Sequence, residues 1–188
     1  GRFRLQAMLR EMVSVGCQVA IIETSSEGIA QSRHLGINYD TLVFTNLYPE
    51  HIESHGSFEA YRAAKLSLFE RLAFLPKKTW RDIQGDHKRS GVIPKRIVVN
   101  LDDESAPLFQ EAKADEHYGY TFAQTKDNER TVAVHLESAS EQIAFEARGQ
   151  QFTLPVMGEV NGSNAAAAIT VGYAFGFAFA DMARALAT

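Results

Sequence analysis

Side chains that could take part in chemistry gather between residues 50 and 65. Those of interest are Glu50, His51, Glu53, His55 and Lys65. Lys65 falls on the apolar stripe of a predicted helix that begins after Ser57. A buried lysine tends to lose its charge, and a neutral amine is nucleophilic even towards carbon dioxide. The resulting carbamate would join His51 and a carboxylate in an oxygen-rich magnesium site. In the alternative interpretation, Lys65 extends to solvent along its stem and His51 hydrogen-bonds within its loop.

A second group of polar side chains follows the apolar run Val19-Ala20-Ile21-Ile22, and consists of Glu23, Thr24, Ser25 and Ser26. The apolar run predicts a buried parallel strand over residues 18–23, with Cys17 as a small core residue before it. A glutamate at such a strand end is equally consistent with a ligand and with a partner for a helix cap. Arg33, a little further on, has a guanidinium that can bind a carboxylate in bidentate fashion.

The elements expected to position these side chains alternate between helices and apolar strands. In order they are a helix over 2–15, strands over 18–23 and 39–46, a helix over 57–72, a strand over 96–101, a helix from about Ser105 and a strand over 118–122. This order is typical of an α/β fold with a mostly parallel sheet flanked by helices. Such sheets bind ligands at the carboxyl ends of their strands, where Glu23 and Thr45-Asn46 lie.

The last third of the chain has a different pattern. Residues 131–156 alternate apolar and polar side chains between polar turns, which predicts a small antiparallel β meander appended to the parallel sheet. A helix rich in alanine follows, with Asn161 or Ser163 as its expected cap. Residues 75–95 hold six Lys or Arg against two Asp and are expected to form an exposed insertion.

Four motifs, in order, resemble the central ATP-binding domain of the Mur ligases, which add amino acids to the UDP-MurNAc peptide of bacterial cell-wall precursors. They are Glu23-Thr24-Ser25-Ser26-x-Gly28, Phe44-Thr45-Asn46-Leu47 with Glu50-His51 and the lysine helix, Asn100-x-Asp102-Asp103, and Gly158-x-x-Asn161-x-x-Asn164. The sequence is most similar to the branch that adds the third residue, the UDP-N-acetylmuramoyl-dipeptide ligases. It departs from the family at Glu27 and Glu50, where histidine and aspartate are usual.

The resemblance implies a role for individual residues. Glu23, His51 and a carbamylated Lys65 would hold magnesium and serve catalysis. Ser25, Ser26 and Arg33 would bind the UDP-MurNAc-dipeptide. Asn161 and Asn164 would bind the nucleotide, with Asn164 beside the adenine of ATP. The implied reaction is ATP-dependent amide-bond formation through an acyl phosphate, with an amino acid as the second substrate.

Composition limits the remaining possibilities. The chain has 188 residues, 45% of them hydrophobic, a net charge of −4 and one cysteine, which is typical of a soluble globular protein without a disulfide framework. The charge gives no reason to expect a nucleic-acid partner, and no segment is long and apolar enough for membrane insertion. We therefore expect a cytoplasmic protein; the sequence says nothing of its oligomeric state.

The sequence contains no G-x-x-x-x-G-K-[ST] motif, the usual phosphate-binding loop of this chemistry. We therefore expect residues 1–188 to be one central domain that lacks the upstream phosphate loop and the C-terminal domain. Alone, these residues are expected to be inactive. Two alternatives remain. The first is a related ATP-dependent ligase such as a folylpolyglutamate synthase, and the second is a non-catalytic binding or scaffold module.

Overall fold

The protein is represented by a computed structural model that describes residues 1–48, 56–82, 90–123, 128–137 and 142–187. The chain forms two compact units, and each is built from separated stretches of sequence. Unit 1 comprises residues 1–40, 48–95 and 112–115, and unit 2 comprises residues 41–47, 96–111 and 116–188. We describe each unit separately.

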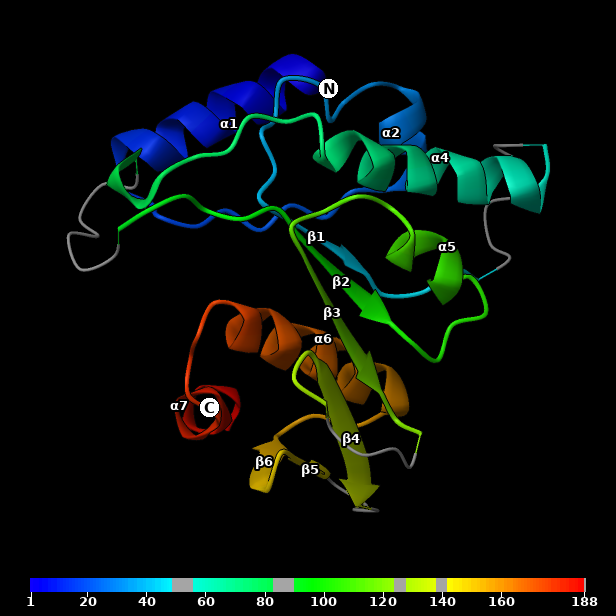
Figure 1. Cartoon of the computed structure of the whole chain (residues 1–188), viewed down its shortest axis with the longest axis vertical. Helices are drawn as coiled ribbons and strands as arrows, with labels where there is room; N and C mark the ends of the chain where they lie inside the picture. The colour runs from blue at the N-terminus through cyan, green and yellow to red at the C-terminus, as the bar shows by residue number, and fades with distance from the viewer. Residues whose placement is uncertain (49–55, 83–89, 124–127, 138–141, 188) are drawn as a thin grey trace. The chain divides into compact units, whose positions relative to one another are not determined.

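Unit 2 is built on a six-stranded sheet in the order β1-β2-β3-β4-β5-β6 (Figure 1). The strands are β1 (Thr41–Phe44), β2 (Arg96–Asn100), β3 (Glu116–Thr121), β4 (Thr131–Glu137), β5 (Ile143–Ala147) and β6 (Gln150–Leu154). Strands β1 to β4 pair in parallel, whereas β4, β5 and β6 pair antiparallel. The predicted fold class, a mostly parallel sheet with a small antiparallel appendage, is confirmed.

Helix α6 (Glu159–Ala174) covers the middle of this sheet and contacts strands β2 to β5. Its buried positions are mostly small, including Ala165, Ala166 and Ala167, which lets the helix backbone approach the strands closely. The strands contribute larger apolar side chains such as Phe145 and Phe152, whose rings stack at 5.1 Å between centroids. Helix α7 (Phe179–Leu186) packs on α6 and β6, and α5 (Ala106–Gln110) packs on β2.

One glycine is required by close packing within unit 2. A Cβ atom at Gly119 of β3 would lie 2.6 Å from the Leu101 side chain, far inside van der Waals contact. The Leu101 amide donates a hydrogen bond to the Tyr120 carbonyl at 2.9 Å, which fixes the turn after β2 beside β3. The absence of a side chain at residue 119 therefore allows the chain leaving β2 to lie against β3.

Unit 1 contains the helices α1 (Arg2–Ser14), α2 (Ser26–Ala30) and α4 (Phe58–Leu72) and a short 3₁₀ turn, η1 (Trp80–Asp82). Helix α4 begins as predicted, because the Ser57 hydroxyl accepts a hydrogen bond from the Ala60 amide at 3.1 Å. Its buried face packs against α2 and includes Tyr61, Leu68 and Leu72. Helix α1 is tied to a later segment by Gln6, whose side-chain amide donates to the Leu35 carbonyl.

The prediction of a strand over residues 18–23 is wrong. Residues 17–25 form no strand, Val19 and Ile21 are 72% and 96% exposed, and Cys17 is exposed rather than buried. A doubly buried strand needs hydrogen-bonding neighbours and helices over both faces. No strand in the described part of the chain pairs with residues 18–23, so the apolar run lacks the partners that its composition would suit.

The basic stretch 75–95 is only partly the exposed insertion that its composition predicts. Lys77 and Arg81 are exposed, but Ile93 and Lys95 are each only 2% exposed. Their burial follows from backbone pairing, since the Ile93 amide donates to the Lys78 carbonyl at 2.8 Å.

None of the helices in the described ranges has the length and apolar character needed to cross a membrane.

Candidate functional site

Unit 1 contains a pocket of about 260 Å³ that brings together three of the residues singled out from the sequence, Glu23, Ser25 and Arg33. The pocket lies where the chain from residue 22 to residue 28 meets the amino end of α1 and the segment before β1. Its remaining wall combines apolar and polar side chains, namely Arg4, Leu5, Met8, Ile22, Thr24, His34 and Tyr39, with Gly1 and Gly28. A pocket with an apolar wall and a few polar groups is typical of a small-molecule site.

Ser25 and Ser26 have different positions around α2. The Ser25 hydroxyl accepts a hydrogen bond from the Gly28 amide at 3.1 Å, so it is the N-cap of the helix. It keeps its own proton, which can be donated to a ligand. Ser26 is buried at 4% exposure. The pocket is therefore lined by Ser25, and Ser26 is part of the packed interior.

The charged residues of this motif project from the body of unit 1. Glu23 and Arg33 are both exposed, and a guanidinium nitrogen of Arg33 donates to the Gln31 side chain at 2.5 Å. Glu27, the acid that departs from the family pattern, is also exposed. Its carboxylate accepts a hydrogen bond from the side-chain amide of Gln31 at 3.3 Å. Gln31 thus contacts both residues, and Glu27 is not among the pocket-lining residues.

His34 and Tyr39 were not predicted from the sequence as site residues, yet both line the pocket. Nδ1 of His34 and the hydroxyl of Tyr39 are buried and have no hydrogen bond of good geometry among the described residues. Burial raises the pKa of Tyr39 above its ordinary value, and the nearby Thr24 hydroxyl offsets part of that increase. These two buried polar atoms can hydrogen-bond to a ligand, which would lower the free-energy cost of their burial.

His34 is expected to make the stability of the protein depend on pH. Burial, reinforced by the positive charge of Arg71, lowers the pKa of His34 below 6.5 in the folded state. The unfolded chain therefore binds the proton more readily, and stability is expected to fall as pH decreases below about 6.5. In His34→Leu, the difference in free energy of unfolding between pH 7.5 and pH 5.5 should shrink.

The measurement is urea unfolding of wild type and variant at both pH values. His135→Leu is the matched control, because His135 is exposed in β4. An unchanged pH dependence in His34→Leu would contradict this assignment.

Lys65 lies on the face of α4 that carries Tyr61, as the sequence predicts. It is half-buried, and its ammonium nitrogen lies 5.2 Å from the centroid of the Tyr61 ring, within the range of a cation–π interaction. His51 lies outside the described residues. Within the described ranges, no three His, Cys, Asp or Glu side chains gather as a metal site. Magnesium binding by Glu23, His51 and Lys65 therefore stays a prediction.

Asn161 and Asn164 lie in the first turns of α6, three residues apart, and therefore share one side of the helix. Both are exposed. The predicted cap at Asn161 or Ser163 is wrong, because α6 begins at Glu159 and its N-cap is Gly158, with φ of 96°. Glycine adopts that backbone angle without strain, so the helix starts earlier than the polar residues suggest. The Asn161 side chain instead donates to the Met157 carbonyl at 2.7 Å.

The acidic pair after β2 holds loops together. Asp103 accepts hydrogen bonds from the Leu47 and Ser105 amides, both at 2.8 Å, and Asp102 accepts one from the Phe122 amide at 2.7 Å. Both carboxylates therefore have structural partners at the carboxyl ends of the parallel strands. Asp102 and Asp103 thus connect the loops that follow β1, β2 and β3.

The six-stranded, mostly parallel sheet with its flanking helices defines an α/β domain. The chain belongs to the Mur ligase middle domain family, whose model matches residues 2–172.

Known relatives agree with this family. The chain is 31% identical to a UDP-N-acetylmuramoyl-L-alanyl-D-glutamate–2,6-diaminopimelate ligase of Bacillus velezensis, over 97% of this chain and 35% of the relative. It is 32% identical to a UDP-N-acetylmuramyl-tripeptide synthetase of Roseiflexus, over 92% of this chain and 33% of the relative. The chain thus spans about a third of the length of these relatives.

Solved structures show the same architecture. A structure of a UDP-N-acetylmuramoyl-L-alanyl-D-glutamate–2,6-diaminopimelate ligase matches with a TM-score of 0.72 and 25% identity, over 97% of this chain and 35% of the other. A crystal structure of MurF from Acinetobacter baumannii matches with a TM-score of 0.56 and 17% identity, over 79% of this chain and 29% of the other. The second likeness shows the fold alone.

Proposed function

We propose that this chain is the middle domain of an ATP-dependent ligase that adds an amino acid to UDP-MurNAc-L-Ala-D-Glu during peptidoglycan precursor synthesis. The observation that carries the proposal is the pocket of unit 1, which gathers Glu23, Ser25 and Arg33 in a member of the Mur ligase family. Two relatives, a tripeptide synthetase and a diaminopimelate ligase, support this substrate class. Its localisation would be cytoplasmic, where nucleotide-linked precursors are made.

The carboxylate of the dipeptide substrate is the group that Arg33 would bind. An exposed guanidinium on the pocket wall can hold a carboxylate through two parallel hydrogen bonds, which fixes both its position and its orientation. The Ser25 hydroxyl would donate a further hydrogen bond to the same ligand. Ser26, being buried, would act through the position of α2.

Magnesium would be held by Glu23, His51 and carbamylated Lys65. The exposed carboxylate of Glu23 and the carbamate that the half-buried Lys65 would carry both supply the oxygen ligands that this ion prefers. When bound, magnesium would neutralise the negative charge that develops on the phosphate oxygens. Asn161 and Asn164 would bind the adenine-containing end of ATP through amide groups that both donate and accept hydrogen bonds.

The reaction would proceed in two displacements. The substrate carboxylate oxygen attacks the γ-phosphorus of ATP, and ADP leaves, so that an acyl phosphate forms. The amino nitrogen of the incoming amino acid then attacks the acyl carbon, loses a proton and displaces inorganic phosphate. The residues of this chain contribute by binding and orienting the carboxylate beside the nucleotide. We further propose that the phosphate loop and the amino-acid-binding domain lie outside residues 1–188.

The test is release of inorganic phosphate by the full-length protein with ATP, magnesium and UDP-MurNAc-L-Ala-D-Glu, across a panel of amino acids. Release that requires both the dipeptide substrate and one amino acid is the expected result. Arg33→Lys keeps the charge but loses the bidentate geometry, and should raise KM for the dipeptide substrate. Release with a folate substrate would instead indicate a folylpolyglutamate synthase, and none with any substrate would indicate a binding or scaffold module.

A further inference from the structure

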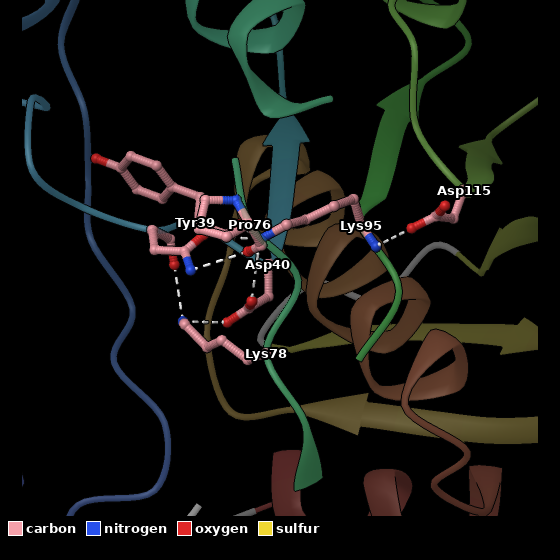
Figure 2. Close-up of polar contacts among 7 residues, drawn as sticks. Tyr39, Asp40, Pro76, Lys78, Lys95 and Asp115 are labelled. Carbon is pink, nitrogen blue, oxygen red and sulfur yellow. Dashed lines mark hydrogen bonds and ion pairs between the residues drawn. The ribbon is translucent and has the colours of Figure 1, made fainter. Parts of the chain in front are cut away.

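Unit 1 contains a buried lysine that the proposed reaction does not use. Lys95 is 2% exposed, and its ammonium donates to three oxygens, shown in Figure 2. The acceptors are Oδ1 of Asn38 at 2.8 Å, the backbone carbonyl of Tyr39 at 2.5 Å and Oδ1 of Asp40 at 3.3 Å. All three donor positions of the ammonium are therefore directed at three consecutive residues.

Two of these three residues, Asn38 and Asp40, have further hydrogen bonds. Lys78 donates to the Asn38 carbonyl at 2.7 Å and to Asp40 Oδ2 at 2.6 Å, and the Asn38 side chain donates to the Pro76 carbonyl at 3.0 Å. Asp40 thus bridges two ammonium groups. We call Asn38, Asp40, Lys78 and Lys95 the lysine cluster; it fixes the backbone on both sides of Tyr39.

Lys95 itself is anchored through its backbone. Its amide donates to Asp115 Oδ2 at 2.7 Å, its carbonyl accepts from the Asp115 amide at 2.9 Å, and Asp115 also binds Lys77. Asp40, Lys95 and Asp115 stand immediately before β1, β2 and β3 in the sequence. The backbone from which the Lys95 side chain extends is therefore held by Asp115, independently of residues 38–40.

The side chain of Tyr39 points away from this cluster and reaches the pocket. Its ring extends away from the Lys95 side chain while its carbonyl accepts the Lys95 hydrogen bond (Figure 2). Tyr39 belongs to the pocket wall, together with Glu23, Ser25 and Arg33, and its hydroxyl is buried without a hydrogen bond of good geometry among the described residues. Tyr39 is thus the one residue in Figure 2 that both belongs to the pocket wall and is held by the Lys95 ammonium.

We infer that Lys95 is a positioning residue for the pocket: its buried ammonium locks the backbone at Asn38–Asp40 and thereby holds the Tyr39 hydroxyl ready to hydrogen-bond a polar, carboxylate-bearing ligand. This inference rests on the proposed function, and it adds Tyr39 to the residues that contact the ligand. A neutral side chain at residue 95 would leave a carbonyl and two side-chain oxygens without this donor in a partly buried place, so residues 38–40 would move to regain hydrogen bonds.

The electrostatics agree with a lysine that is retained for its hydrogen bonds. Burial lowers the pKa of Lys95, the nearby Lys78 reinforces that decrease, and the carboxylates of Asp40 and Asp115 oppose it. A buried ammonium of this kind contributes little net stability compared with an apolar residue of similar size. It does impose one geometry on the groups that it binds, which an apolar residue would not.

The test compares four variants of the full-length protein: Lys95→Met, Tyr39→Phe, the double variant, and Lys77→Met as the matched control. Lys77 is 50% exposed and binds Asp115 but none of residues 38–40. Lys95→Met and Tyr39→Phe should each raise KM for the dipeptide substrate about three- to tenfold, with KM for ATP unchanged. The double variant should show no further rise beyond Lys95→Met, because both changes remove the same contact. Lys77→Met should behave as wild type.

A second measurement does not depend on catalysis. Hydrogen–deuterium exchange of a peptide spanning residues 36–42 should be faster in Lys95→Met than in wild type, and unchanged in Tyr39→Phe and Lys77→Met. An unchanged substrate KM in Lys95→Met, or additive effects in the double variant, would overturn the positioning role. If wild type shows no ligase activity, the proposed function fails, and unchanged exchange in Lys95→Met would then overturn the lock on residues 38–40 as well.

Discussion

Lys65→Ala is expected to lower kcat of the full-length ligase by about 100- to 1000-fold, the usual cost of removing one preorganised electrostatic contact to a transition state. In the proposed mechanism Lys65 carries a carbamate that helps hold magnesium, and alanine supplies no oxygen ligand. The half-buried position beside Tyr61 on α4 makes the substitution tolerable for folding, because alanine favours the helix and leaves the Tyr61 ring in place.

The control is Lys113→Ala, because Lys113 is exposed in unit 1 and belongs to none of the predicted motifs. Its kcat should equal that of wild type. Carbon-13 NMR with labelled bicarbonate adds a direct readout, since a carbamate signal should appear in wild type and be missing in Lys65→Ala. Full activity of Lys65→Ala would remove this lysine from the metal site.

Phe109→Ala is expected to lower the free energy of unfolding by about 3–5 kcal/mol, the usual cost of truncating a fully buried aromatic residue. Phe109 of α5 is fully buried, and its ring stacks on that of Phe44 with 3.8 Å between centroids and 13° between planes. Phe44 is the last residue of β1. The cavity would therefore open directly beneath the loop that begins at Thr45.

The measurement is equilibrium unfolding in urea, with Phe177→Ala as the control. Phe177 is 53% exposed and lies between α6 and α7, so its truncation should change stability by less than about 0.5 kcal/mol. Equal effects of the two substitutions would show that the Phe44–Phe109 stack contributes no more than a surface ring.

Sequence periodicity predicted the strands whose partners lie inside the described chain, but not the helices α2 and α7. The apolar runs at β1 and β2 and the alternating pattern of β5 and β6 all find paired neighbours. The run at residues 18–23 is similarly apolar, but no strand among the described residues pairs with it. Composition alone therefore led to the wrong prediction of a strand there. Strand formation depends on pairing, and a single sequence does not show which segments pair.

Motif resemblance singled out neighbouring residues that the structure brings to one pocket. Glu23, Ser25 and Arg33 lie within eleven residues of each other, and the structure places all three at one pocket. Tyr39, His34 and Lys95 were not predicted, because a single sequence does not show contacts between residues far apart in the chain. The hydrogen bond between Lys95 and Asn38 is an example. The basic composition around Lys95 instead suggested a solvated loop, and no periodic pattern marks a single buried lysine.

The interleaving of the two units has a consequence for how the chain folds. Unit 1 is complete only when residues 112–115 join residues 1–40 and 48–95, and the sheet of unit 2 begins with residues 41–47. Neither unit can therefore be cut out as one uninterrupted piece of gene, and unit 1 is complete only after residue 115 has been synthesised. Because native contacts connect residues far apart in sequence, loop-closure entropy must be overcome first, and we expect the chain to fold slowly and as one cooperative body.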